Sequence, residues 1–80
     1  MFSKELFGSR LREARQRIGE SQTEAAAVLG GTATLISDME KGRRTTTLDK
    51  FAQLAQHYNI SADYLLGLTD EPRPLRDEQR

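Results

Sequence analysis

The sequence predicts an all-α domain of five short helices, and three features of the chain support this. Four of the expected helices begin at a serine or threonine that can cap them, and glycine or asparagine stands where helices should end. No stretch alternates apolar and polar residues in the way that a half-buried strand does. At 80 residues the chain has room for one domain with a single small core.

The first helix is expected over residues 3–18, with Gly19 as its stop. Gly8 interrupts this helix and should be a weak point, since glycine costs about 1 kcal/mol relative to alanine inside a helix. The arginines of the helix fall on more than one face. Its inward residues are predicted to be Leu6, Leu11, Ala14 and Ile18.

The segment Ser21–Glu40 reads as two helices joined by a glycine turn, and it carries most of the functional information. Ser21 and Glu24 have the spacing of a capping box, which predicts a helix over residues 23–29. Gly30 and Gly31 are then expected to supply the positive φ that ends a helix without a Cβ clash.

Thr32 is expected to cap the second helix of this pair, over residues 33–40. One face of that helix is apolar, with Leu35, Ile36 and Met39. The opposite face is small and polar, with Ala33, Thr34, Ser37 and Asp38. A face of this kind suits insertion into the major groove of DNA, and a solvated surface explains it equally well.

Two further helices complete the predicted domain. Thr47 should cap the fourth helix, which ends at Asn59, and Ser61 should cap a fifth helix over residues 62–66 that stops at Gly67. The predicted buried residues of these two helices are Leu48, Phe51, Leu54, Ala55, Tyr58, Tyr64, Leu65 and Leu66. The domain is therefore assigned to residues 1–68, and residues 69–80 are expected to be a polar, flexible C-terminal tail.

Composition narrows the possible environments and partners. The chain has no cysteine, which agrees with a reducing cytoplasm, and no apolar stretch long enough for a membrane span. Twelve basic and twelve acidic side chains give a formal net charge of zero, so long-range attraction to DNA should be weak. The basic residues are distributed unevenly along the chain, however. Three of them come directly after the predicted third helix: Lys41, Arg43 and Arg44.

Four motifs in order resemble the Cro/repressor-type, lambda-repressor-like helix-turn-helix family. These motifs are R-L-R-E-A-R from Arg10, S-Q-T-E from Ser21, L-G-G-T-A-T-L-I-S-D-M-E-K-G-R-R from Leu29 and N-I-S-A-D-Y-L-L-G from Asn59. They cover about residues 8–68 at the spacings of the family. The resemblance implies a lambda-repressor-like DNA-binding domain whose second and third helices form the helix-turn-helix.

The resemblance also implies roles for individual residues. Gln22 corresponds to a glutamine that bonds a phosphate and braces a side chain of the recognition helix. Arg15 and Glu40 correspond to a structural ion pair that ties the first helix to the end of the third. The groove-facing positions are Thr32, Ala33, Thr34, Ser37 and Asp38, and the positions that touch the sugar-phosphate backbone are Lys41, Arg43 and Arg44.

Three positions depart from the pattern of the family. Ala33 and Asp38 stand where many members have arginine or glutamine to grip a base, so direct readout should be light. Thr34, Ser37 and Asp38 would then read a few bases with the help of water, or half-site spacing and DNA deformability would provide specificity, or the face would bind something other than DNA. Glu20 replaces a leucine of the family, and Ile18 is expected to fill the gap.

Catalytic and metal chemistry find no support in the sequence. There is no phosphate-binding glycine loop and no set of serine, histidine and acid that suggests a nucleophile, so we expect neither an enzyme nor a cofactor. His57 is the only histidine and is interpreted as a surface residue. The role of Arg10 is left open, because it could meet a phosphate or lie on a solvated face.

The sequence therefore predicts a sequence-specific transcriptional regulator, a repressor that binds a double-stranded, inverted-repeat operator as a homodimer. It is expected in the cytoplasm of a bacterial cell, of bacterial or phage origin and associated with the nucleoid. The family usually forms its dimer through the last helix and the residues directly after it, here Asp63–Leu68. The alternative is a protein-interaction module, such as an antitoxin or the target of an anti-repressor.

Overall fold

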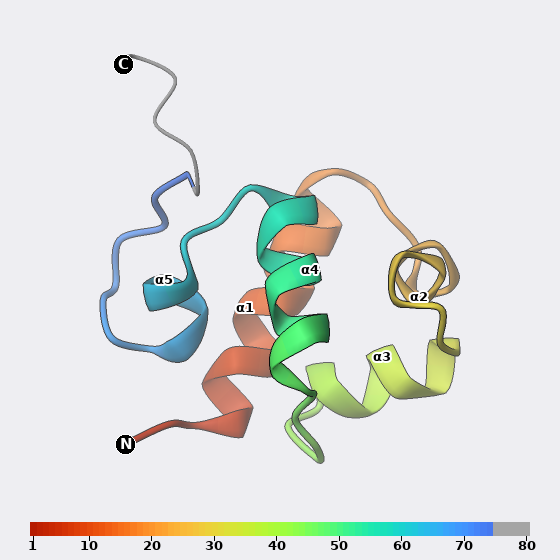
Figure 1. The fold of residues 1–80 in the computed structure, drawn as a ribbon, viewed down its shortest axis with the longest axis horizontal. Coiled ribbons are helices and arrows are strands. Elements are labelled where there is room, and N and C mark those ends of the chain that lie inside the picture. The colour runs from red at the N-terminus through yellow and green to blue at the C-terminus, as the bar shows by residue number, and fades with distance from the viewer. Residues whose placement is uncertain (75–80) are drawn as a thin grey trace.

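The computed structural model describes residues 1–74, and within them it contains five helices and no strand, as predicted. The helices are α1 (Lys4–Arg17), α2 (Gln22–Leu29), α3 (Ala33–Glu40), α4 (Leu48–Tyr58) and α5 (Ala62–Leu66). Helix α3 packs against α1 and α2, and α5 packs against α1 and α4, so α2 and α3 lie on one side of α1 and α4, with α5 on the other (Figure 1). None of the described helices is long and apolar enough to cross a membrane.

Capping hydroxyls account for the helix boundaries; four were predicted, and the fifth, Ser3, caps α1 instead of starting it. A serine or threonine hydroxyl accepts from a backbone N–H at the start of every described helix: Ser3, Ser21, Thr32, Thr47 and Ser61. Before α2 both halves of the capping box form, since the Ser21 N–H also donates to Glu24 Oε1 at 2.8 Å. This hydrogen bonding lowers the pKa of the Glu24 carboxyl.

The turn between α2 and α3 differs from the prediction at one glycine. Gly30 has the expected left-handed conformation with φ 66°, whereas Gly31 is absent from the residues with positive φ. Gly31 instead donates its N–H to the Ala26 carbonyl and leads directly into the Thr32 cap. One left-handed residue is therefore enough to make the corner, and α2 begins at Gln22, one residue earlier than expected.

The core forms where all five helices meet. Its largest fully buried side chains are Phe7, Leu11, Ile36, Met39, Leu54 and Leu65. Each apolar side chain of this size stabilises the fold by about 1.5–3 kcal/mol when it leaves water. Phe7 replaces Leu6 as the inward residue of the first turn of α1, because positions 7, 11 and 14 share one helical face.

Three predicted core residues are exposed instead. Leu6 is 36% exposed at the edge of the core, and Ile18 is 57% exposed because it caps the end of α1 beyond its packed face. Leu48 is 86% exposed, since the first residue of α4 points away from the core that Leu54 and Ala55 enter.

Gly8 is a packing residue, so its interpretation as a weak point was wrong. It is buried, and a Cβ atom built on it would lie 2.1 Å from the backbone oxygen of Met39. Helix α1 thus touches the last turn of α3 directly, with no side chain between the two backbones. The absence of a side chain at residue 8 fixes the distance between these helices.

Arg10 holds the segment that comes after α5 and is not free for DNA. Its Nη1 donates to the carbonyls of Tyr64 and Thr69, its Nη2 lies 2.9 Å from Asp70 Oδ1, and its guanidinium stacks on the Tyr64 ring. The Arg73 carbonyl also accepts from the Ser61 N–H at 2.8 Å. Residues 69–73 of the predicted tail are therefore tied to the domain, and residues 75–80 of that tail lie outside the described residues.

We predict that Gly8→Ala lowers the free energy of unfolding by about 3 kcal/mol, because the added methyl must displace the backbone of α3. Urea denaturation followed by circular dichroism measures this change. Ser9→Ala is the matched control, since Ser9 is the exposed neighbour on the same helix and should change stability by only a few tenths of a kcal/mol. Equal stability of the two variants would contradict the close approach of α1 and α3.

Candidate nucleic-acid interface

The polar face of α3 is accessible, as the sequence predicts. Thr32 and Thr34 are exposed, and Ala33, Ser37 and Asp38 are half-buried. Opposite them, Ile36 and Met39 are completely buried and Leu35 packs on the edge of the core. The apolar face fixes the helix to the domain, so its short polar side chains are held in a defined orientation at the surface.

The basic loop after α3 begins with a tight turn that fixes its direction. The Arg43 N–H bonds to the Asp38 carbonyl at 2.9 Å and the Gly42 N–H bonds to the Met39 carbonyl at 3.0 Å, which is the Schellman pattern. Gly42 has φ 75°, and a Cβ there would lie 3.0 Å from the Glu5 backbone of α1. Lys41, Arg43 and Arg44 are all exposed and continue the surface of α3.

Asp38 has a counter-charge that sequence reasoning missed. Arg43 Nη1 lies 3.8 Å from Asp38 Oδ1, and both side chains remain in contact with solvent. An exposed pair at this distance contributes less than about 1 kcal/mol to stability. Its effect is on the surface potential, since Arg43 partly offsets the negative charge that Asp38 adds to the polar face.

A polar hollow of about 400 Å³ separates the first turns of α3 and α4. It is lined by Gly31, Thr32, Leu35, Arg44, Thr45, Thr46, Thr47 and Lys50. The three threonines of this loop face it, one of them as the cap of α4. Lys50, which was not among the residues predicted from the sequence, adds a second cation beside Arg44. The only sequence signal for it was a lysine in the first turn of the helix that follows the basic loop.

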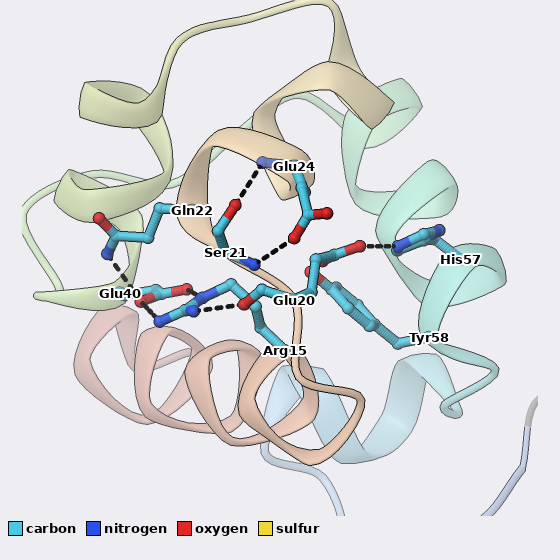
Figure 2. A network of polar contacts seen from close by, with 8 residues as sticks. All are labelled: Arg15, Glu20, Ser21, Gln22, Glu24, Glu40, His57 and Tyr58. Atoms are coloured by element: carbon cyan, nitrogen blue, oxygen red, sulfur yellow. Dashed lines mark hydrogen bonds and ion pairs between the residues drawn. The ribbon is translucent and has the colours of Figure 1, made fainter.

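Arg15, Glu40 and Gln22 form a network that connects α1, α2 and α3 (Figure 2). Arg15 Nε donates to Glu40 Oε2 at 2.6 Å and its Nη2 donates to Glu40 Oε1 at 3.0 Å, so the pair is bidentate. The Gln22 amide donates to the same Oε1 at 3.1 Å. The side chain of Glu40 is 3% exposed and that of Arg15 is 12% exposed. The ion pair implied by the resemblance is thus present, and the hydrogen bond to Glu40 raises the pKa of Arg15.

Gln22 therefore braces the last residue of α3 rather than its exposed polar face. Its side chain is half-buried at the first position of α2. One of its two amide N–H groups holds the C-terminal end of α3, and the phosphate contact stays a prediction from the resemblance.

Glu20 forms a second network, which corrects the prediction for Ile18 and adds a partner to His57, exposed at the surface as predicted. Its two carboxylate oxygens accept from Tyr58 Oη at 2.5 Å and contact His57 Nε2 at 2.6 Å (Figure 2). The Glu20 side chain is 10% exposed, and Ile18 does not fill the gap left by the family's leucine, because it points into solvent. His57 is a surface residue that also pairs with this carboxylate.

The two networks meet at the connection between α1 and α2. Arg15 Nη1 donates to the Glu20 backbone carbonyl at 2.7 Å, so one arginine contacts both the α1–α2 connection and the end of α3. Burial and the neighbouring Glu20 carboxylate raise the pKa of Tyr58 above its ordinary value, which keeps the phenol protonated as a donor. Helix α4 is thereby attached to the start of the helix-turn-helix.

The model of the helix-turn-helix domain family matches residues 6–68, which include all five helices except the first two residues of α1. This chain belongs to that family. Among the described residues of this helix-turn-helix domain, no cluster of histidine and acidic side chains is arranged to hold a metal ion.

Known relatives of this helix-turn-helix domain include regulators and repressors. The HTH-type transcriptional regulator ImmR of Bacillus subtilis is 43% identical over 60 residues, which are 75% of this chain and 47% of the relative. The chain thus spans about half the length of that protein.

Two crystal structures have the same fold as the domain. The restriction-modification controller protein C.AhdI from Aeromonas hydrophila superposes with a TM-score of 0.69 at 32% identity, over 78% of this chain and 90% of that one. The P22 c2 repressor protein in complex with synthetic operator 9T superposes with a TM-score of 0.72 at 26% identity, over 76% of this chain and 92% of that one. These matches confirm the lambda-repressor-like fold that the sequence predicts.

Breaking the Arg15–Glu40 pair from one side should be strongly destabilising. Arg15→Met leaves the Glu40 carboxylate buried without its cation, and we expect the free energy of unfolding to fall by about 3–5 kcal/mol. Replacing both residues by methionine should restore at least about 1 kcal/mol of this loss, because no unpaired charge then remains. Urea denaturation of the single and double variants measures the coupling. Arg12→Met, at an exposed position on the same helix, should be nearly neutral, and a similar loss there would exclude the ion pair as the cause.

The raised pKa of Tyr58 predicts a loss of stability in alkaline solution. Because the folded chain favours the neutral phenol, its contribution is complete below the unfolded pKa of about 10 and is lost as the pH rises through the higher folded pKa. We expect the free energy of unfolding to decrease between about pH 9.5 and pH 11. Tyr58→Phe should reduce this slope without abolishing it, since burial raises the pKa of Tyr64 as well. An identical slope in the variant would show that Tyr58 ionises as easily in the folded chain as in the unfolded one.

Proposed function

We propose that this chain is the DNA-binding domain of a transcriptional regulator and that it represses by occupying an operator at the bacterial nucleoid. The observation that carries the proposal is the accessible polar face of α3, which is continuous with an exposed basic loop. Membership of the helix-turn-helix family and the likeness to a repressor crystallised with a synthetic operator support it. The relative ImmR is named as a transcriptional regulator, which agrees with this role.

In this proposal α3 enters the major groove with its polar face toward the bases. Thr34 and Ser37 are the best candidates for hydrogen bonds to base edges, directly or through water, because they are short and accessible. Ala33 can touch a thymine methyl, and Asp38 can accept from the N4 amino group of cytosine. Thr32, at the start of the helix, lines the polar hollow and is assigned with them to the groove-facing surface.

The phosphate contacts are assigned to the basic side chains that come after α3. Lys41, Arg43 and Arg44 are exposed, and Lys50 joins Arg44 at the polar hollow. Because the net charge of the chain is zero, these local cations must supply most of its electrostatic affinity for DNA. The Gln22 amide has two N–H donors, so one can bond to a phosphate while the other holds Glu40.

Dimerisation is part of the proposal, since one short recognition helix without an arginine or a glutamine on its face reads few bases. Two copies on an inverted repeat would bind half-sites about one helical turn apart and multiply the discrimination of each. A protein partner of the antitoxin or anti-repressor type remains the alternative occupant of this surface, and salt dependence distinguishes the two. For binding through phosphate contacts, the logarithm of the affinity falls linearly with the logarithm of the salt concentration. Binding through apolar contacts does not show this fall.

The residues assigned to phosphates and the residues assigned to bases should respond differently to substitution. Arg43→Ala combined with Arg44→Ala should weaken binding to all DNA sequences alike and reduce the slope of log affinity against log salt by about 2. Thr34→Ala or Ser37→Ala should instead change which operator is preferred. Selection from random double-stranded DNA defines the operator, and fluorescence anisotropy at several salt concentrations measures affinity.

The double variant Arg12→Ala and Arg17→Ala is the control for charge, because it removes two exposed arginines from α1. It should leave the operator preference unchanged and alter the affinity much less. If Thr34→Ala and Ser37→Ala select the same sequence as the parent chain, the polar face of α3 is not the reading surface. No enrichment of any sequence would reject the proposed function.

A further inference from the structure

The strongest feature without an assigned role is the side chain of Glu20, which lies in the connection between α1 and α2 and contacts α4 (Figure 2). One of its carboxylate oxygens accepts from Tyr58 Oη at 2.5 Å, and the other contacts His57 Nε2 at 2.6 Å. The side chain is only 10% exposed. A carboxylate at this depth destabilises a fold unless it is well hydrogen-bonded, whereas an apolar side chain of similar size would pack there without that cost. Glu20 is therefore better explained by where it holds α4 than by the space it fills.

The position of α4 matters for the proposed DNA surface because the first turn of this helix carries Lys50. Lys50 lines the polar hollow together with Arg44. Helix α4 packs mainly on α2 and α5 and has little direct contact with α3, so its place relative to α3 is set indirectly. Lys50 lies about 12 Å along the helix axis from Tyr58, and a tilt of about 10° around the Tyr58 end would move Lys50 by about 2 Å. A shift of this size is enough to break a hydrogen bond to a phosphate.

Glu20 also contacts the residues that hold α3, but through its backbone. Its carbonyl accepts from Arg15 Nη1 at 2.7 Å, and the same arginine binds Glu40 at the end of α3. A change of the Glu20 side chain removes the contacts with α4 and leaves this backbone contact in place. The side chain of Glu20 therefore controls the position of α4 separately from that of α3.

We propose that Glu20 is a positioning residue for DNA binding, which holds the first turn of α4, with Lys50, at a fixed place relative to the polar face of α3. This role rests on the proposed function, since it matters only if α3 and Lys50 contact the same stretch of DNA. In that function α3 reads the bases, whereas the phosphates are bound partly from α4. Loss of the Glu20 contacts should therefore weaken phosphate binding and leave base readout intact. A residue that only stabilised the fold would have no such selective effect.

Fluorescence anisotropy of the full 80-residue chain on its selected operator, at several salt concentrations, tests this role. In Glu20→Leu the affinity should fall about tenfold, and the slope of log affinity against log salt should decrease by about 1 for each bound copy, because Lys50 no longer meets its phosphate. The sequence selected from random double-stranded DNA should stay the same. Glu20→Gln should keep the slope of the parent chain, since its amide oxygen can still accept from Tyr58.

Glu13→Leu is the matched control, because it removes the same charge and also breaks a tyrosine–carboxylate hydrogen bond, from Tyr64 Oη at 3.2 Å. That bond attaches α5 rather than α4 to α1, so the salt slope should not change. Tyr58→Phe combined with His57→Ala breaks the Glu20 contacts from the side of α4 and should reproduce the loss expected for Glu20→Leu. Adding Glu20→Leu to this pair should cause little further loss, since all three changes remove the same contacts.

Three results would overturn this role. These are a Glu20→Leu variant with the affinity and salt slope of the parent chain, an equal loss of slope in Glu13→Leu, and a changed operator preference in Glu20→Leu, which would place its effect on α3. If circular dichroism shows that Glu20→Leu does not fold, the variant with Tyr58→Phe and His57→Ala is subject to the same comparisons. Failure of the proposed function is distinguishable, because the parent chain would then enrich no sequence from random DNA, and the role of Glu20 would fall with it.

Discussion

The domain depends on one buried carboxylate, that of Glu40, and on the arginine that compensates it. Glu40 ends α3, and its oxygens accept from Arg15 of α1 and Gln22 of α2, so three helices are joined at a single acid. Removing such a charge from water is unfavourable unless nearly every hydrogen-bonding position is satisfied. The geometry that satisfies it leaves α3 little freedom to rotate. The orientation of the proposed recognition surface is therefore set by a polar constraint at its buried end, while the apolar residues of α3 supply most of the stability.

A second carboxylate, Glu20, extends this constraint to α4 by a different route. Most of the family is expected to use a leucine there, and a leucine would only fill space. Glu20 instead accepts from Tyr58 and contacts His57, and its backbone carbonyl accepts from Arg15. The two networks thus share Arg15, and the helix-turn-helix is held to α1 and α4 through hydrogen bonds with defined directions. Gly8 completes the arrangement, because the direct contact of α1 with the backbone of Met39 sets how close α1 and α3 lie.

Local signals in the sequence were sufficient to predict the five helices. The capping hydroxyls and the left-handed Gly30 and Asn59 act within one turn of chain, and all but the Ser3 cap were predicted. Predictions failed where the outcome depended on contacts between distant segments. The helical pattern alone could not show that Gly8 faces a backbone, that Leu48 points outward or that Arg10 binds residues 69 and 70. The Arg15–Glu40 pair came from the family resemblance, and the contacts of Glu20 came from neither source, because they depend on side chains 37 and 38 residues away.

The Asp38–Arg43 pair bears on how the proposed regulator would search a chromosome. Non-specific association with DNA is driven by counterion release and grows with the number of free cations that face the phosphates. A surface in which one arginine is partly occupied by an aspartate, on a chain without net charge, would spend little time on random DNA. Most molecules would then be free in solution, reaching the operator by three-dimensional diffusion rather than by sliding. The same acid that weakens the grip of each recognition helix would thus leave a larger share of the protein unbound by random DNA and available to the operator.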